Sequence, residues 1–184
     1  MKQSPHPATA RVFFALWPTA PERAQLAAWQ APLQRLCGGR AMSDETLHTT
    51  LVFIGNIELH GMEVLQRAAR EVSAKCFELC FDEARYWGHN HIVHAASGHM
   101  LQPLAQLVDA LEQRLAAHHF KFDRRDYQPH VTLLRNARWS DAPLPAMQPV
   151  NWQIRDFALV QSVPHDGLAD YQVLARFPLR ASGG

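Results

Sequence analysis

The sequence predicts an α+β fold of two similar lobes, each made mostly of antiparallel sheet with flanking helices, around a central cleft. Apolar strand-like runs alternate along the chain with stretches of helical periodicity. The phrase His-x-Thr-Leu occurs twice, beginning at His48 and at His130. Each copy follows a strand-like run at a similar distance, because Val12 to His48 and Ile92 to His130 span 36 and 38 positions. We therefore expect two strand–helix–strand lobes that each contribute one His-x-Thr strand.

The first lobe is expected to begin with a strand at 11–17, after a disordered lead over residues 1–10. Thr19, followed three positions later by Glu22, has the form of a capping box that opens a helix. Pro32 should kink or end that helix, because proline has no amide hydrogen to donate. The domain as a whole is expected to cover residues 11–180.

The remaining elements follow from the same patterns. The His48 strand should end at Gly55-Asn56, where turn-forming residues interrupt the apolar run. The spacing of apolar residues predicts amphipathic helices at 61–75 and 101–115. Strands are expected at 77–86, at 91–96 and from His130 onward. A Pro-rich loop at 143–149 should follow, and then a closing pair of strands at 152–163 and 171–179 around the turn Pro164–Gly167.

Composition excludes several classes of protein. The net charge of +1 gives no global basic field of the kind that coats nucleic acid without specificity. No apolar run approaches the roughly 18 residues of a membrane span, and the first ten residues lack an apolar signal segment. Three cysteines, an odd number without metal-type spacing, indicate reduced thiols. We expect a cytoplasmic protein that does not bind membranes.

The repeated phrase carries the functional prediction. Residues i and i+2 of a strand point to the same side, so His48 shares a face with Thr50, and His130 shares one with Thr132. Phe53 is expected on the opposite, buried face. Random placement of 11 His, 6 Thr and 21 Leu among 184 residues gives only about 0.04 copies of His-x-Thr-Leu. Two copies therefore indicate a shared site rather than chance.

Paired His-x-Thr strands in an α+β chain of this length resemble the two-histidine phosphoesterase superfamily. The segments RVFFALWP, LHTTLVFIGN and PHVTLLRNA, with Ser162, Gly167 and Tyr171 near the end, are similar to the bacterial and archaeal RNA 2′,3′-cyclic phosphodiesterases. These LigT-like proteins are also called 2′-5′ RNA ligases. The resemblance extends from about Arg11 to Leu179. His94 departs from it, since relatives often carry an aromatic residue there.

The resemblance implies hydrolysis of RNA 2′,3′-cyclic phosphate ends to 2′-phosphates, with 2′-5′ RNA ligation as the reverse reaction. Such hydrolysis needs a base for water, an acid for the leaving oxygen and donors for the phosphoryl oxygens. Two imidazoles with ordinary pKa values near 6.5 can supply the acid and the base, and threonine hydroxyls can donate to the phosphate. No metal or other cofactor is needed. The resemblance makes His48 the acid and His130 the base, while the residues alone leave that order open.

Further residues are assigned by the same resemblance. Arg135 matches an arginine that contacts the phosphate, and a guanidinium suits that task. Strict alternation would place Arg135 opposite His130, so it reaches the cleft only if the strand ends or bulges near Leu134. Phe13 or Phe14 could stack on a base, although core positions are the commoner role for both. Tyr171 is likewise expected to be structural.

Three alternatives stay open beside this interpretation. His89, His91 and His94 could form a metal site, although a solvated histidine-rich turn explains them more simply. A non-catalytic RNA-binding module would leave the paired phrase unexplained. A different small cyclic phosphate or a 2′-5′ oligonucleotide could be the substrate of the same two histidines. RNA ends are the expected partner, and the protein is expected to be a monomer without an obligate protein partner.

Overall fold

The two buried faces of the first strand explain how the fold is layered. In the computed structural model, which describes residues 8–99, 101–124, 126–140, 142–165 and 168–181, the strand β1 (Thr9–Leu16) is central in its sheet. The side chains of Val12, Phe14 and Leu16 enter the main core, while Phe13 and Ala15 pack on the opposite face. Because β1 is buried on both faces, it separates the main core from a second layer of side chains that includes Phe13 and Ala15.

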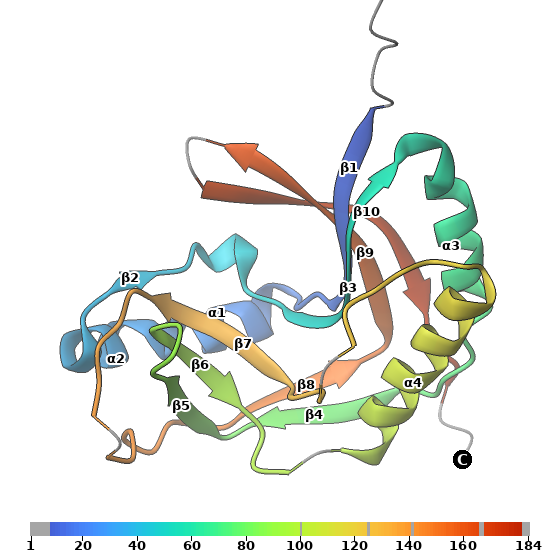
Figure 1. Ribbon diagram of the computed structural model, residues 1–184. Coiled ribbons are helices and arrows are strands. Elements are labelled where there is room, and N and C mark those ends of the chain that lie inside the picture. Colours follow the sequence, from blue (N-terminus) through green and yellow to red (C-terminus); the bar gives the residue numbers. More distant parts are fainter. Residues whose placement is uncertain (1–7, 100, 125, 141, 166–167, 182–184) are drawn as a thin grey trace, which may run out of the picture.

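Two four-stranded antiparallel sheets form the two lobes, which confirms the predicted α+β architecture (Figure 1). The first sheet has the order β10-β9-β1-β3, with β3 at Thr49–Glu58, β9 at Asp156–His165 and β10 at Leu168–Pro178. The second sheet has the order β2-β7-β6-β5, at Arg40–Ala41, His130–Arg135, Ile92–Ala96 and Glu83–Trp87. A ribbon of β4 (Phe77–Phe81) and β8 (Val150–Ile154) joins the lobes.

The helices cover the opposite lobe from the one that the sequence suggests. The helices α1 (Ala20–Ala28) and α2 (Gln30–Cys37) lie in the chain between β1 and β3, yet they pack against β2, β7 and β8. The helix α4 (Gln102–Ala117) lies between β6 and β7, yet it packs with α3 (Met62–Arg70) near β3 (Figure 1). Both strand–helix–strand segments are present along the chain as predicted, but the connecting helices of each lobe pack on the other lobe.

The first helix starts after Thr19 and is interrupted near Pro32, as predicted, but both features differ in detail from the prediction. The first helix begins directly after Thr19, whose hydroxyl hydrogen-bonds the Glu22 carboxylate instead of a backbone amide. The helix breaks at Trp29, before Pro32, which lies in the first turn of α2. Proline cannot donate a hydrogen bond to the carbonyl four residues earlier, so a break just upstream of Pro32 is the expected consequence.

Four expected strand boundaries are wrong. Gly55 does not end β3, which continues to Glu58; instead its φ of +86° accommodates a bulge opposite β1. The predicted strand at 77–86 divides into β4 and β5, and that at 152–163 into β8 and β9, because each run passes from the connecting ribbon into a main sheet. Thr9 and Ala10 belong to β1 rather than to a disordered lead.

The rest of that expected lead lies outside the described residues, as do two residues of the turn predicted at Pro164–Gly167.

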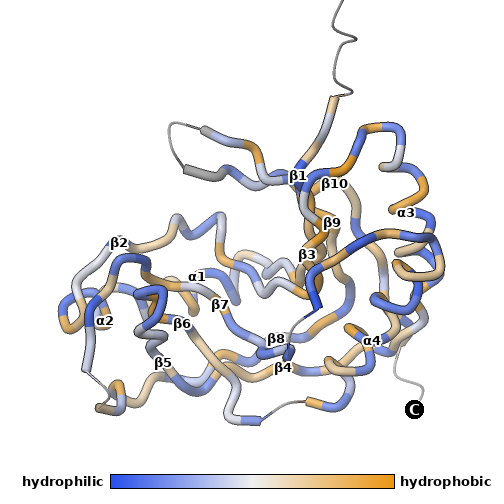
Figure 2. Tube along the Cα trace, viewed as in Figure 1, coloured by the Kyte–Doolittle hydropathy of each residue, from blue (hydrophilic) through white to orange (hydrophobic). Residues whose placement is uncertain are grey.

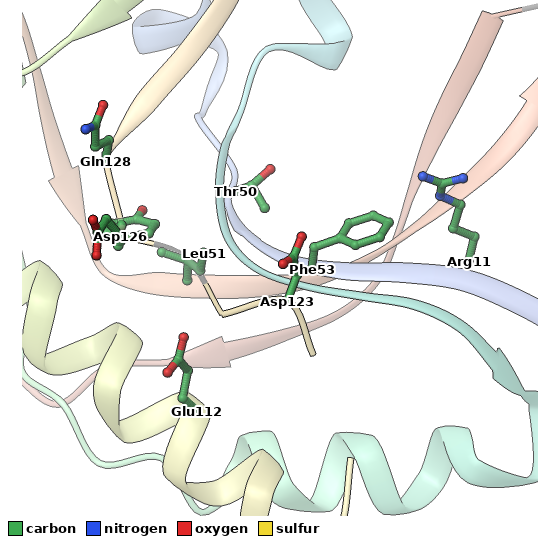
Figure 3. A pocket seen from close by; sticks show the side chains of 9 residues that line it. Arg11, Thr50, Leu51, Phe53, Glu112, Asp123, Asp126 and Gln128 are labelled. Carbon is green, nitrogen blue, oxygen red and sulfur yellow. The ribbon is translucent and has the colours of Figure 1, made fainter. Parts of the chain in front are cut away.

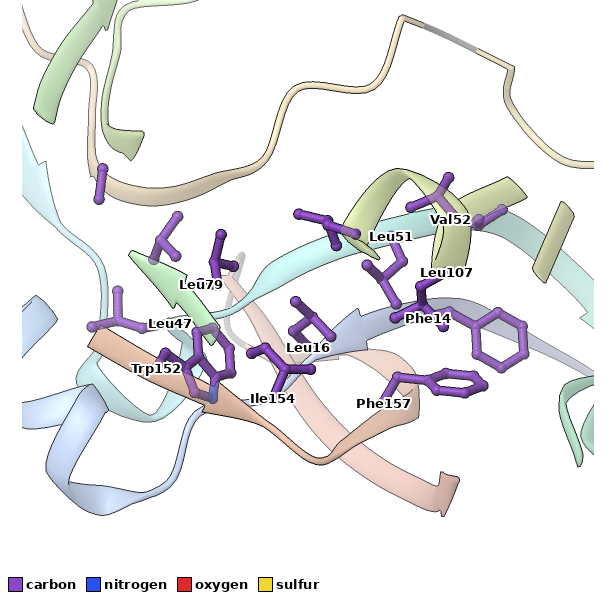
Figure 4. Close-up of a cluster of buried hydrophobic side chains, with 14 of the residues drawn as sticks. Phe14, Leu16, Leu47, Leu51, Val52, Leu79, Leu107, Trp152, Ile154 and Phe157 are labelled. Atoms are coloured by element: carbon purple, nitrogen blue, oxygen red, sulfur yellow. The ribbon is translucent and has the colours of Figure 1, made fainter. Parts of the chain in front are cut away.

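A continuous apolar core lies behind both sheets. Leu47, Leu51, Leu79 and Trp152 bridge the lobes there, next to Phe14 and Phe157, as Figure 4 shows. Along the chain trace the apolar residues concentrate in the strands and on the inner faces of the helices (Figure 2). Within the part of the chain that the structure describes, no helix is both long and apolar enough to cross a bilayer.

Candidate active site

His48 lies immediately before β3 in a pocket of aromatic rings. Its imidazole stacks on Trp17, with ring centroids 5.3 Å apart, and Phe13 and Tyr171 each lie at 5.1 Å. Its Nδ1 donates to the Thr46 carbonyl at 2.6 Å, and its Nε2 is 3.2 Å from the Thr50 hydroxyl. Because a carbonyl can only accept, the neutral ring carries its proton on Nδ1 and leaves Nε2 as an acceptor.

His130 opens β7 in a closely similar arrangement. Its Nδ1 donates to the carbonyl of Gln128, two residues earlier, at 2.9 Å. The ring meets Trp87 edge-on at 4.6 Å and His94 at 5.6 Å. Both histidines therefore use Nδ1 to bind a carbonyl at position i−2, which fixes the ring and leaves Nε2 available.

Both His-x-Thr-Leu phrases contain a β-bulge at the leucine. In β3, Thr50 pairs with Ala15 and Val52 pairs with Phe14, so Leu51 is the extra residue. In β7, Thr132 pairs with His94 and the second residue after it pairs with Val93, so Leu133 is the extra residue. A bulge inserts one residue and reverses the alternation of the strand beyond it.

The bulges explain where Arg135 and Phe53 lie. Each is the fifth residue after its histidine, and the bulge returns each to the face that carries the histidine. Arg135 therefore reaches the cleft, as the condition placed on its role requires. The expectation that Phe53 faces the core is wrong for the same reason, since its half-buried ring lines the groove beside Thr50.

A buried glutamine holds the second bulge. The Gln30 side chain, only 7% exposed, donates from Nε2 to the Leu133 carbonyl at 3.1 Å and to the Met42 carbonyl at 2.8 Å. The Met42 amide donates to the same Leu133 carbonyl at 2.9 Å. The extra residue of the bulge thus keeps its carbonyl satisfied, which a bulge within a sheet otherwise leaves unpaired. Nothing in the sequence pattern identifies Gln30.

Electrostatics connects the two lobes. The pKa of His48 is lowered to about 4, mainly by burial and also by the charges of His130 and Arg135, while the bond to the Thr46 carbonyl opposes the shift. Burial also lowers the pKa of His130, again with a contribution from Arg135. His48, His130 and Arg135 therefore lie within range of one another's charge, and both imidazoles are neutral at pH 7 without a bound anion.

The other predicted residues divide between the site and the core. Thr50 lines the groove, and Thr132 lies on the His130 face of β7. The rings of Phe13 and Tyr171 lie against His48, whereas Phe14 is fully buried in the core.

The alternative metal site is not assembled from the clustered histidines. His94 is buried against Trp87, while the His91 ring is 3.0 Å from the Tyr86 hydroxyl. Among the described residues, no group of three or more His, Cys, Asp or Glu side chains is arranged to hold a metal ion.

His94 predicts a pH-dependent stability. Burial, together with the charges of His130 and Arg85, lowers the pKa of His94 to about 3. Its Nδ1 has no hydrogen-bond partner among the described residues. A folded-state pKa below the ordinary 6.5 means that the unfolded chain binds more protons, so stability is lost as pH falls from 6.5 toward 3. We expect His94→Phe to reduce the slope of unfolding free energy against pH by up to about 1.4 kcal/mol per unit in this range.

Urea unfolding at pH 8, 6 and 4.5 measures this effect. The exposed His60 provides the matched control as His60→Gln. Parallel pH curves for wild type and His94→Phe would show that His94 is not the residue that titrates.

Comparison with known proteins finds relatives over most of the chain. The sequence model described as the 2′-5′ RNA ligase superfamily matches residues 17–166. The RNA 2′,3′-cyclic phosphodiesterase of Escherichia coli K12 is 29% identical over 171 residues, which cover 92% of this chain and 96% of that protein.

Solved structures give the same result. E. coli LigT without ligand superposes with a TM-score of 0.84 at 27% identity, covering 94% of this chain and 98% of LigT. LigT complexed with 3′-AMP matches with the same TM-score and identity, over 94% of this chain and 99% of that one. A protein of Thermus thermophilus, at 22% identity and a TM-score of 0.73, covers 94% of this chain and its own whole length, and it shares the fold.

Proposed function

This chain belongs to the 2′-5′ RNA ligase superfamily, and from that premise we propose that it hydrolyses 2′,3′-cyclic phosphates at RNA ends to 2′-phosphates. One observation carries the proposal above the others. Two lobes each present a histidine whose Nδ1 is bound to a backbone carbonyl, so that Nε2, which in His48 contacts the Thr50 hydroxyl, is the nitrogen that can exchange a proton. The E. coli relative is named for this activity, and LigT has been crystallised with 3′-AMP.

In the proposed mechanism the two imidazoles act on opposite sides of phosphorus. Nε2 of His130 accepts a proton from water as the water attacks phosphorus. Nε2 of His48, protonated, donates to the departing 3′-oxygen, and the phosphate remains on the 2′-oxygen. Thr50 and Thr132 donate hydrogen bonds to the phosphoryl oxygens, and Arg135 neutralises their charge. With a 5′-hydroxyl in place of water, the same two proton transfers would form a bond from the 5′-oxygen to phosphorus, release the 3′-oxygen as a hydroxyl and leave a 2′-5′ linkage.

The lowered pKa values fit this mechanism only with the substrate present. A free site that is electropositive through Arg135 and apolar through Trp17 and Phe13 disfavours a second positive charge on His48. The phosphate anion reverses this effect, because an adjacent negative charge favours imidazolium. Binding of the substrate phosphate thus raises the pKa of His48, so that His48 becomes protonated beside the 3′-oxygen to which it donates.

Analysis of the product end tests the proposal. We expect a 2′,3′-cyclic phosphate oligonucleotide to give only a 2′-phosphate, at the same rate with or without excess chelator. The chain's own acid, base and anion donors are sufficient in the proposed mechanism, so metal removal should not matter. A 3′-phosphate product would invert the placement of acid and base, and activity that returned only with zinc or manganese would contradict the mechanism.

We further propose that the enzyme acts in the cytoplasm as a monomer with one bilobal domain over residues 11–180. The exchanged helices support a single unit, since neither sheet is covered by helices of its own lobe.

A further inference from the structure

We propose that Phe53 and Arg11 form a subsite for a second nucleotide, so that the enzyme prefers oligonucleotides to single nucleoside cyclic phosphates. This inference rests on the proposed function and names its substrate class. It starts from a groove that is larger than the two histidines require.

The groove extends from the histidine site along the first sheet. It has a volume of about 830 Å³ and is lined from β1, β3, β7, β9 and β10. Thr50, Phe13 and Tyr171 line its inner part, next to His48, and Arg135 faces them from the second lobe. This volume lies in the upper part of the range for small-molecule sites, which is roughly 300–1,000 Å³. The groove therefore has room beyond a terminal nucleotide.

Phe53 and Arg11 form a flat surface in the outer part of the groove. The Arg11 guanidinium lies over the Phe53 ring, with Cζ 5.0 Å from the ring centroid. Figure 3 shows the Phe53 ring extended toward Arg11, from neighbouring strands. Aromatic rings and guanidinium planes are the surfaces on which unpaired bases stack, with little regard for base identity. An exposed arginine stacked on a half-buried ring at a groove wall is thus suited to a nucleobase.

The spacing along β1 fits a second nucleotide. Arg11 and Phe13 lie two residues apart on the same strand face, which is about 7 Å along the strand. Phe13 contacts the His48 ring and so marks the level of the reacting phosphate. Phe53 pairs with Phe13 across the sheet, and Arg11 lies one step further out. The outer surface therefore begins about one nucleotide from the phosphate.

Charge directs the RNA chain into the groove. Among the described residues that line the groove, Arg11 and Arg135 are basic and none is acidic. A second pocket shares Arg11, Thr50 and Phe53 with the groove, and its other walls carry the carboxylates of Glu112, Asp123 and Asp126 (Figure 3). Phosphodiesters are repelled by carboxylates and attracted by guanidinium groups. The nucleotide on the 5′ side of the cyclic phosphate should therefore follow the groove, where it meets Phe53 and Arg11, rather than enter the second pocket.

The test compares two substrates that share the reacting end. Kinetics are measured on adenosine 2′,3′-cyclic phosphate and on an adenylyl dinucleotide that ends in the same cyclic phosphate. We expect the dinucleotide to have a kcat/KM at least about tenfold higher, from one added stacking contact. Phe53→Leu and Arg11→Gln should each bring that ratio toward one, mainly through KM.

Arg70→Gln is the matched control, because it removes one positive charge from exposed α3 outside the groove and should keep the wild-type ratio. Salt provides an independent measure. In the wild type, the logarithm of the ratio of the two kcat/KM values should fall by about 0.7 for each tenfold increase in salt concentration, because the dinucleotide carries one more phosphodiester. In Arg11→Gln this salt dependence of the ratio should vanish.

Equal kcat/KM values for the two substrates in the wild type would overturn the inference while leaving the proposed function intact. A preference that survived in both variants would place the second nucleotide elsewhere and also overturn it. If neither substrate were hydrolysed, the proposed function itself would fail. Binding of the dinucleotide 2′-phosphate, measured by calorimetry in the same variants, would then still decide whether Phe53 and Arg11 hold the second nucleotide.

Discussion

His48→Ala and His130→Ala should each lower kcat on a cyclic phosphate by about 10²-fold or more. Each removes one positioned acid or base, which typically contributes about 10²–10⁴-fold. Both side chains are half-buried at strand starts, and each Nδ1 binds a carbonyl of the preceding loop rather than a group in the core, so the fold should persist. The rate constant of hydrolysis under single-turnover conditions measures the loss. Thermal unfolding of each variant checks that it is folded.

The threonine variants and the pH profile of the wild type provide comparisons for the histidine variants. Thr50→Ala and Thr132→Ala should cost less, because each removes one neutral donor from a shared anion site. The wild type should have a bell-shaped profile of kcat against pH, since one imidazole must be protonated and the other neutral. Wild-type turnover in a double histidine variant would sink the mechanism altogether.

Arg135→Ala should have the second largest effect, a loss of about 10²–10³-fold in kcat/KM, comparable to the removal of one oxyanion donor. Gln30→Met should produce part of this loss without touching substrate, because Gln30 holds the carbonyl of the bulge that turns Arg135 into the cleft. The matched control is Gln34→Met on the same helix, where the exposed amide bonds only the Gly39 carbonyl.

A double-mutant cycle separates this positioning role from general destabilisation. If Gln30 acts through Arg135, Gln30→Met should cost little activity in the Arg135→Ala background. The affinity for a nucleotide 2′-phosphate should follow the same pattern. Additive losses in the double variant would assign Gln30 a purely structural role, and wild-type affinity in Gln30→Met would exclude the link to Arg135.

Local periodicity predicted much of this molecule. Two repeated His-x-Thr strands indicated the family, the α+β class and a pair of facing lobes, because alternation along a strand is a local property. The placement of Thr50 beside His48 follows from the same rule. Comparison with known proteins confirms the family and the fold, while the roles of the individual site residues are the ones that the kinetic experiments above address.

The rest depended on long-range packing. A bulge leaves no clear trace in a run of apolar residues, so Phe53 was predicted on the wrong face. For the same reason Arg135 could be predicted in the cleft only on the condition that its strand ends or bulges near Leu134. The run at 152–163 has the pattern of one strand, although Arg155 separates two strands of different sheets. Helix α1 shows an apolar stripe but not which sheet will cover it. Such features are decided by partners far along the chain.

The exchange of helices and strands between the lobes has a consequence for synthesis of the protein. Both histidine motifs leave the ribosome by residue 135, but β1 pairs with β9, and β9 ends only at His165. The Phe13 face that surrounds His48 is completed by Tyr171 on β10, later still. At about 5–20 residues per second, both motifs exist for some seconds before their last partners are made. A chain stopped in that interval would carry both histidines yet lack the sheet that aligns them, so catalytic competence should arrive with the final strand.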